Sequence, residues 1–282
     1  MNKLEGGHHI SNKMYDWRVQ SIYQALRQAG KDQGTLEVSD LIELGHLDQY
    51  HYLGVSACDQ GIDILGLDEH ASVLDIGSGV GGPARYLAYK TGCQVTGVEL
   101  QQPLNEIAIE LTDRVGLIDK IRYITGDILT LALKSNYYDH FVSWLVFLHI
   151  PDKKKLFSAC FNALKPEGSF LIEDMVALNP FTEKETEILK KVIFAPDIPD
   201  CETYCDYLKT AGFVNIRFEN LSASWTDWVN ERYQQYKADK AEHITLYGED
   251  IFHSRSHLYR QTAELFNAGN LGGMRITGSK PL

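Results

Sequence analysis

The amino-acid sequence predicts an α/β protein in which a seven-stranded, doubly wound sheet carries a helical cap. From Val73 onward, short apolar, β-branched runs alternate with amphipathic segments, as they do in βαβ units. A glycine-rich turn follows the first of these strands, and an aromatic, charged segment at residues 222–266 interrupts the alternation. With 282 residues and 44% hydrophobic content, the chain is long enough for a full core and a substantial cap.

Seven segments have the composition of strands. They are Ser72–Ile76, Gln94–Leu100, Lys120–Thr125, His140–Val146, Ser169–Asp174, Asn215–Glu219 and Gly273–Thr277. Apolar residues at helical spacing predict helices at Pro83–Lys90, Gln102–Val115, Lys153–Leu164 and Glu202–Thr210. Strands that alternate with helices in this way are typical of a Rossmann-like sheet.

Composition excludes several classes of partner. The formal net charge of −11 repels polyanions, and no basic stripe is present, so we expect no nucleic-acid partner. No apolar run approaches the roughly 20 residues that span a bilayer. Residues 1–12 are polar and lack the apolar core of a signal peptide. These features predict a cytoplasmic protein without a membrane partner, and no spacing of cysteines or histidines predicts a metal site.

The most informative segment runs from residue 72 to residue 82, where an apolar strand ends in a glycine-rich turn that leads into a helix. Such a turn lets backbone N–H groups approach a ligand closely. Gly77, Gly79 and Gly82 match the dinucleotide pattern G-x-G-x-x-G, whereas Gly77, Gly79 and Gly81 match G-x-G-x-G. The turn therefore predicts a nucleotide-type cofactor without deciding which one.

Three acids at strand ends favour a cofactor without phosphate. Asp75 lies two residues before Gly77, where it would repel a pyrophosphate and attract an ammonium group. Glu99 ends the second strand, where it can accept hydrogen bonds from ribose hydroxyls. Asp127 follows the third strand and can accept from an adenine amine. Each acid alone could equally cap a helix, but together they predict S-adenosylmethionine, with a nicotinamide cofactor as the alternative.

Three motifs then resemble those of the class I S-adenosylmethionine-dependent methyltransferases: VLDIGSGVGGPARYLA, VTGVEL and TGDIL, in this order. Residues 271–278 resemble the last strand of that fold, which runs antiparallel into the sheet. The resemblance implies cofactor contacts at Tyr50, Asp75, Gly77, Ser78, Gly79, Glu99, Leu100, Asp127, Ile128 and Trp144. Together with the two segments that fall outside the alternation of strands and helices, it gives four expected parts. They are an N-terminal helical lid at 1–54, a Rossmann-like cofactor-binding core at 55–221, a helical cap insertion at 222–266 and a final antiparallel strand at 267–282.

Within that class, residues 137–149 and 164–174 resemble small-molecule methyltransferases of the sarcosine/dimethylglycine and phosphoethanolamine type. The resemblance implies that His149 and an N-terminal tyrosine orient the methyl acceptor and help to remove its proton. Tyr15 is the predicted partner of His149, and Tyr50 is predicted to cover the cofactor. Tyr23 and Tyr52 are further candidates, and any of these tyrosines could instead serve in packing.

Two departures from this type bear on the substrate. Amine methyltransferases of the type keep an acid four residues before the histidine, and here that position is Leu145. The phosphate-binding Arg and Tyr of the phosphobase enzymes have no counterpart in residues 190–200, which disfavours phosphoethanolamine. We therefore expect N- or S-methylation of a small metabolite. A substrate carboxylate could pair with one of five arginines: Arg217, Arg232, Arg255, Arg260 or Arg275.

Several alternatives stay open at this point. O- or C-methylation of a small natural product, a nicotinamide-dependent oxidoreductase and a non-enzymatic cofactor sensor all fit the same glycine turn. A homodimer is also left open. In the cap, Trp225, Trp228, Tyr233 and Tyr236 recur at helical spacing. Such a stripe could line a substrate pocket, but it is more often a packing surface, and we favour packing.

Overall fold

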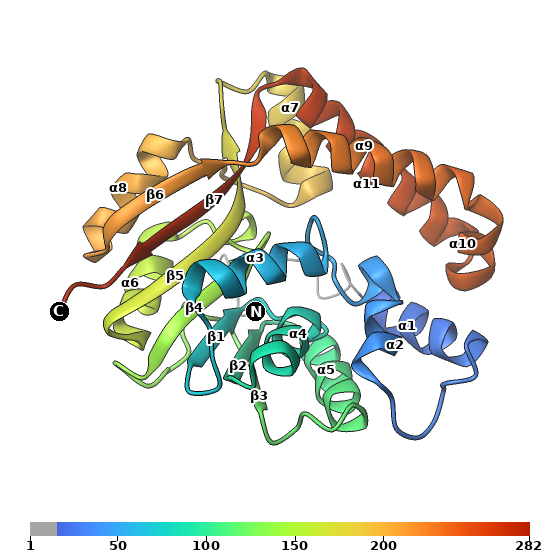
Figure 1. Cartoon of the computed structure of the whole chain (residues 1–282). Coiled ribbons are helices and arrows are strands. Elements are labelled where there is room, and N and C mark those ends of the chain that lie inside the picture. Colours follow the sequence, from blue (N-terminus) through green and yellow to red (C-terminus); the bar gives the residue numbers. More distant parts are fainter. Residues whose placement is uncertain (1–15) are drawn as a thin grey trace, which may run out of the picture.

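The computed structural model describes residues 16–282, and its centre is a seven-stranded sheet in the order β3-β2-β1-β4-β5-β7-β6 (Figure 1). The strands are β1 Ser72–Ile76, β2 Gln94–Glu99, β3 Ile121–Thr125, β4 Tyr138–Trp144, β5 Leu164–Ala177, β6 Val214–Asn220 and β7 Leu271–Ser279. Only β7 is antiparallel to its neighbours, β5 and β6. The strand order reverses between β1 and β4, which is where open α/β sheets form a crevice for ligands. The predicted fold class is confirmed.

Helices cover both faces of the sheet and form the cap (Figure 1). They are α1 Asp16–Gln28, α2 Val38–Ile42, α3 Val55–Leu65, α4 Gly82–Thr91, α5 Gln102–Arg114, α6 Lys153–Ala163, α7 Glu183–Ile188, α8 Cys201–Ala211, α9 Ser222–Ala238, α10 Lys240–Tyr247 and α11 Glu249–Ala268. Short irregular helices lie at η1 Gly45–Leu47, η2 Phe147–His149 and η3 Leu189–Ile193. One apolar core lies between the sheet and α6 and α8, and a second lies between the sheet and α3 and α4.

Of the strands whose boundaries differ from the prediction, β5 and β4 matter most for the site. β5 begins at Leu164, where a helix was expected to end, and it continues to Ala177 because it pairs with β7 from Ser169 onward. β4 stops at Trp144 rather than Val146, because Leu145 adopts a φ of 55° and turns the chain into η2. His149 therefore lies on a short helical turn beyond the sheet edge.

The cap forms from segments that are far apart in the chain. Helix α10 lies beside α1 (Figure 1), and the Gln24 side chain donates a hydrogen bond to the carbonyl of Thr245 at 2.9 Å. Inside the cap, Tyr236, Phe252 and Tyr259 form a small apolar cluster. The lid helices and the cap helices together cover the carboxyl ends of the parallel strands.

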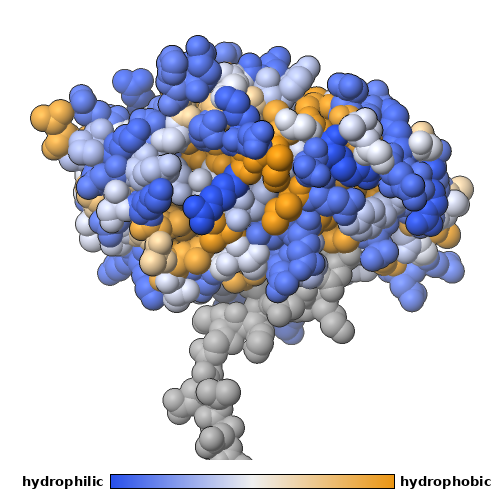
Figure 2. Space-filling view, turned by 90° about the horizontal axis from the view of Figure 1, so that it is seen from below, coloured by the Kyte–Doolittle hydropathy of each residue, from blue (hydrophilic) through white to orange (hydrophobic). Residues whose placement is uncertain are grey.

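The helices and one face of the surface complete the description of the fold. No helix within residues 16–282 combines the length and the apolar character needed to cross a bilayer. On the face shown in Figure 2, hydrophilic side chains surround a smaller central area of hydrophobic ones.

Candidate active site

A cavity of about 510 Å³ opens at the carboxyl edge of the sheet, between the lid and helices α9 and α11. All ten predicted cofactor contacts line it: Tyr50, Asp75, Gly77, Ser78, Gly79, Glu99, Leu100, Asp127, Ile128 and Trp144. His149 lines the same cavity. Tyr15 lies outside the described residues. The structure thus brings the described candidates together, while their individual roles stay predictions.

The glycine turn has a geometry that only glycine satisfies at its first position. Gly77 has a φ of 78°, and a Cβ placed there would lie 2.3 Å from Cγ2 of Val146. The backbone N–H of Gly77 donates to the carbonyl of Val98 at 2.8 Å, which ties the turn to the end of β2. The turn therefore lies directly between the ends of three strands, with no room for a side chain.

Glu99 organises the same turn from the end of β2. Its Oε2 accepts the backbone N–H of Gly79 at 3.0 Å, and its Oε1 accepts that of Gln101 at 2.8 Å. Burial raises the pKa of the Glu99 carboxyl, and these hydrogen bonds oppose the shift. Each carboxylate oxygen keeps a further acceptor site, so Glu99 can hold the turn and still accept from ribose hydroxyls.

Several buried polar atoms in the cavity wall lack a hydrogen-bond partner within the described part of the chain. They are Oδ2 of Asp75, Oγ of Ser78, Oε1 of Gln101 and Nε1 of Trp144. Buried polar groups are normally paired, because an unpaired one costs free energy. Their grouping in one cavity indicates a polar ligand, and a nucleoside with an amino acid tail carries the matching donors and acceptors.

Asp127 both caps a turn of the backbone and lines the cavity. Its Oδ1 accepts the backbone N–H of Leu129 at 2.9 Å, so it caps its own turn, while its exposed side chain lines the cavity. Leu100 and Ile128, which adjoin Glu99 and Asp127 in the chain, add apolar walls to the cavity. The arrangement suits an adenine ring held between apolar side chains, with a carboxylate at its edge.

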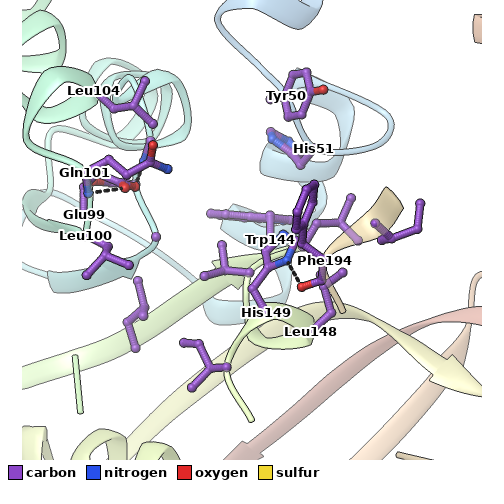
Figure 3. Close-up of a pocket in the computed structure, with 18 of the residues that line it drawn as sticks. Tyr50, His51, Glu99, Leu100, Gln101, Leu104, Trp144, Leu148, His149 and Phe194 are labelled. Carbon is purple, nitrogen blue, oxygen red and sulfur yellow. Dashed lines mark hydrogen bonds between the residues drawn. The ribbon is translucent and has the colours of Figure 1, made fainter. Parts of the chain in front are cut away.

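His149 lies across the cavity from Glu99, Leu100 and Gln101 (Figure 3). Its Nδ1 lies 3.0 Å from the backbone carbonyl of Phe194. A carbonyl oxygen can only accept, so Nδ1 carries the proton and Nε2 keeps its lone pair. Burial lowers the pKa of His149, and the Phe194 carbonyl opposes that shift. His149 is therefore neutral at pH 7 and able to accept a proton at Nε2.

Of the five arginines considered from the sequence, Arg232 and Arg255 line the cavity. The other three lie elsewhere: Arg217, Arg260 and Arg275. Arg275 is neutralised by Glu173, with Nη2 and Oε1 2.7 Å apart. Neither Arg232 nor Arg255 forms an ion pair with an acid among the described side chains, so both can serve an anionic ligand.

Aromatic rings surround the Arg232 guanidinium. Its Cζ lies 4.2 Å from the ring centre of Tyr259, 4.9 Å from that of Trp228 and 5.0 Å from that of Tyr50. Burial raises the pKa of the Tyr50 phenol, but Arg255, Arg232 and Arg18 outweigh burial and lower it. The three guanidinium groups thus favour negative charge near Tyr50.

The aromatic stripe of the cap divides between packing and cavity. Trp225 and Tyr236 are core residues, with exposed fractions of 0% and 3%, and Tyr233 packs against the small cap cluster. Trp228 packs against a core cluster, as favoured from the sequence, and it also lines the cavity. Both Trp225 and Trp228 contact the Tyr52 ring, but Trp225 also packs on Gly273 of β7 and only Trp228 lines the cavity, a difference that spacing alone does not reveal.

The alternative tyrosines divide in a similar way. The hydroxyl of Tyr23 donates to Oε2 of Glu110 at 2.5 Å on α5, and Tyr23 does not line the described cavity. Tyr52 does line it, with its ring 4.7 Å from that of Trp228. Sequence reasoning missed His51, Tyr259 and the Phe194 carbonyl, because nothing in the local pattern distinguishes them from packing residues.

Cofactor affinity is expected to depend on pH through Asp75. Burial raises the pKa of this carboxyl to about 7, and Glu99 adds to the shift. A cationic ligand group binds better to the ionised carboxylate, so affinity should fall as pH drops from 7.5 to 5.5. Calorimetry with S-adenosylhomocysteine measures this and the accompanying proton release. The Asp75→Asn variant should bind weakly with a flat pH profile, and an equally steep profile would remove Asp75 from the interaction.

The strand order with an antiparallel β7 and the cavity lined by strand-end acids define a class: an α/β protein of the methyltransferase type that binds a phosphate-free nucleoside cofactor. The model of a methyltransferase domain matches residues 74–172. Phosphoethanolamine N-methyltransferase of Plasmodium falciparum is 32% identical over 207 residues, covering 71% of this chain and 74% of the relative. The chain belongs to the S-adenosylmethionine-dependent methyltransferases.

Other relatives are longer than this chain. Glycine/sarcosine/dimethylglycine N-methyltransferase of Actinopolyspora halophila is 29% identical over 202 residues, which cover 72% of this chain and 35% of the relative. Phosphoethanolamine N-methyltransferase 2 of Haemonchus contortus shares the fold, with a TM-score of 0.76 and 24% identity over 82% of this chain and 54% of that one. Family membership confirms the predicted cofactor and class, and the nicotinamide alternative is set aside.

Proposed function

We propose that this enzyme methylates the nitrogen of a small amine that also carries an anionic group, a carboxylate or a phosphate. The observation that carries the proposal is the position of Arg232 and Arg255 in the cavity wall, without an acid to neutralise them among the described residues. The relatives support nitrogen as the acceptor, because phosphoethanolamine and glycine/sarcosine/dimethylglycine enzymes are N-methyltransferases by name.

The chemistry divides between the cofactor and the chain. S-adenosylmethionine supplies an electrophilic methyl group. Asp75, Glu99 and Asp127 are the residues proposed to hold the cofactor. Methyl transfer gains chiefly from positioning and from exclusion of water. The ammonium form of the acceptor must lose a proton before its nitrogen can attack, and Nε2 of His149 is the group proposed to accept that proton. Tyr15 stays a proposed partner in orienting the amine.

The cavity wall around His149 suits an acceptor whose amine is neutral when it lies beside the positively charged cofactor. Leu145 lines the cavity where an acid was expected for a cationic amine, and Leu148 and Met175 continue this apolar surface. An apolar wall favours the neutral amine over its conjugate acid, because desolvation penalises the charged form. The anionic end is then the part of the substrate that the protein recognises by charge.

Charge recognition is tested by Arg255→Gln. A hydrogen bond to a charged group contributes about 1.5–3 kcal/mol, so KM for the anionic acceptor should rise at least about tenfold. Calorimetry with S-adenosylhomocysteine measures the effect on cofactor affinity separately, because Arg255 also acts on Tyr50, the predicted cover of the cofactor. Arg260→Gln is the matched control, since Arg260 lies on the same helix and pairs with Glu264 at the surface. Steady-state kinetics with labelled cofactor measure both variants.

The acceptor itself is identified by a panel that separates the two anions. Sarcosine and glycine carry a carboxylate, phosphoethanolamine carries a phosphate, and ethanolamine carries neither. Methyl transfer to ethanolamine as efficient as transfer to the anionic amines would overturn the proposal. Transfer to an oxygen or carbon acceptor, read from the mass and fragmentation of the product, would overturn nitrogen as the target.

A further inference from the structure

A buried carboxylate and a buried ammonium lie behind His149, away from the cavity. Asp174 lies near the end of β5, and Lys153 begins α6; each is 1% exposed. Neither is part of the described cavity lining. Burying two charges is costly, and an apolar pair of the same size often stabilises a protein equally well or better. Stability alone therefore gives no reason for this pair.

Lys153 connects the two chain segments that hold the histidine. Its Nζ donates to the carbonyl of Ile150 at 2.7 Å and reaches the carbonyl of Asp197 at 3.4 Å. Ile150 directly follows His149, and Asp197 lies three residues after Phe194. One ammonium group thus bridges the turn that carries His149 and the loop that supplies its hydrogen-bond acceptor.

Asp174 holds the other side of the same turn. Burial raises the pKa of its carboxyl to about 7, and the charge of Lys153 and the backbone N–H of Leu148, which directly precedes His149, oppose that shift. The backbone N–H of Met175 donates to Oδ1 at 2.9 Å. The hydroxyl of Tyr204 on α8 lies 3.3 Å from Oδ2. Asp174 therefore fixes the turn to β5 and α8, which are rigid elements of the core.

We propose that Asp174 and Lys153 are positioning residues that set the tautomer and the orientation of His149. They clamp residues 147–150 against residues 194–197, so that Nδ1–H of His149 points to the Phe194 carbonyl and Nε2 is left as the proton acceptor. The clamp deepens the proposed function because it rests on proton acceptance by His149. Its structural effect, the tautomer, is measurable without turnover.

The decisive variants are Lys153→Met and Asp174→Asn in the full chain. Glu173→Gln is the matched control, because Glu173 is also buried on β5 but pairs with Arg275 rather than with the His149 turn. Nitrogen-15 NMR of histidine-labelled protein reports which ring nitrogen carries the proton. The His149 signals are assigned by their loss in His149→Gln. The wild type and the control should show a single Nδ1–H form, whereas both clamp variants should show a mixture.

Kinetics supply the second readout. Misplacing a reacting group by about 1 Å costs roughly 100-fold in rate, so kcat should fall at least about tenfold in both clamp variants while KM for the cofactor changes less than twofold. Lys153→Arg should restore part of the loss. Binding of S-adenosylhomocysteine, measured by calorimetry, selects variants that fold. Should Lys153→Met fail to fold, Tyr204→Phe tests the same clamp, with a smaller change in the same direction.

The outcomes separate the two proposals. An unchanged Nδ1–H signal in both clamp variants would overturn the clamp, whatever the enzyme methylates. If ethanolamine is methylated as efficiently as the anionic amines but the tautomer changes as expected, the clamp stands and the proposed function falls. A change of the same size in Glu173→Gln would also overturn the clamp, because it would show a general effect of losing a buried carboxylate.

Discussion

Replacement of Gly77 by alanine is expected to lower cofactor affinity by about 100-fold or more. The new Cβ would lie 2.3 Å from Cγ2 of Val146 and 2.9 Å from its Cβ, so rotation of the short valine side chain cannot relieve the overlap and the turn must separate from residue 146. That movement shifts the backbone N–H groups and the Glu99 carboxylate away from the ligand together. Calorimetric titration with S-adenosylhomocysteine measures the loss directly.

Gly116→Ala is the control for this prediction. Gly116 also has a positive φ, 70°, but a Cβ placed there meets nothing within 4 Å. Both variants therefore pay the backbone strain of a non-glycine residue, about 1–2 kcal/mol, and only Gly77→Ala adds the steric overlap at the cavity. Thermal unfolding compares their stabilities. Equal cofactor affinity in the two variants would show that the turn does not form the cofactor site.

The second large effect is expected for His149→Ala. Loss of a general base costs roughly 100- to 10,000-fold in turnover, while affinity for S-adenosylhomocysteine should change less than twofold. Because the proton acceptor must be neutral, kcat at saturating cofactor should fall as pH drops through the pKa of His149, which burial holds below 6.5. This acidic limb should disappear in the variant.

His140→Gln is the matched control for His149→Ala. His140 is a half-buried histidine on β4 whose Nδ1 lies 2.8 Å from the Ser169 hydroxyl, outside the described cavity lining. It should keep both turnover and the acidic limb. Full turnover in His149→Ala would assign the proton transfer to another group, of which Tyr15 is the first to test.

The cofactor edge was accessible to sequence reasoning because its parts are local. A strand that ends in Asp75 and runs into Gly77 specifies its own turn, since glycine alone adopts the required φ without strain. Glu99 and Asp127 follow strands in the same pattern, and parallel strands place their carboxyl ends at one edge. All ten residues predicted to contact the cofactor accordingly line one cavity.

The acceptor side was less accessible because its walls come from separate segments. Arg232 and Arg255 were indistinguishable from Arg217, Arg260 and Arg275 in the sequence. The structure separated them by showing which guanidinium groups have acidic partners and which line the cavity. A cavity role for Trp228 was not favoured from the sequence, because helical spacing reports a shared face and not everything that the face contacts.

By itself, the sequence determined the sheet, the glycine turn, the acids at the strand ends and hence the cofactor, because each depends on residues close in the chain and on the common direction of parallel strands. Only the tertiary structure decided which arginines face the cavity, which cap aromatics line it, and which nitrogen of His149 is protonated. These depend on partners such as the Phe194 carbonyl, 45 residues away. Their positions follow from packing between distant elements, which local pattern and propensity do not encode.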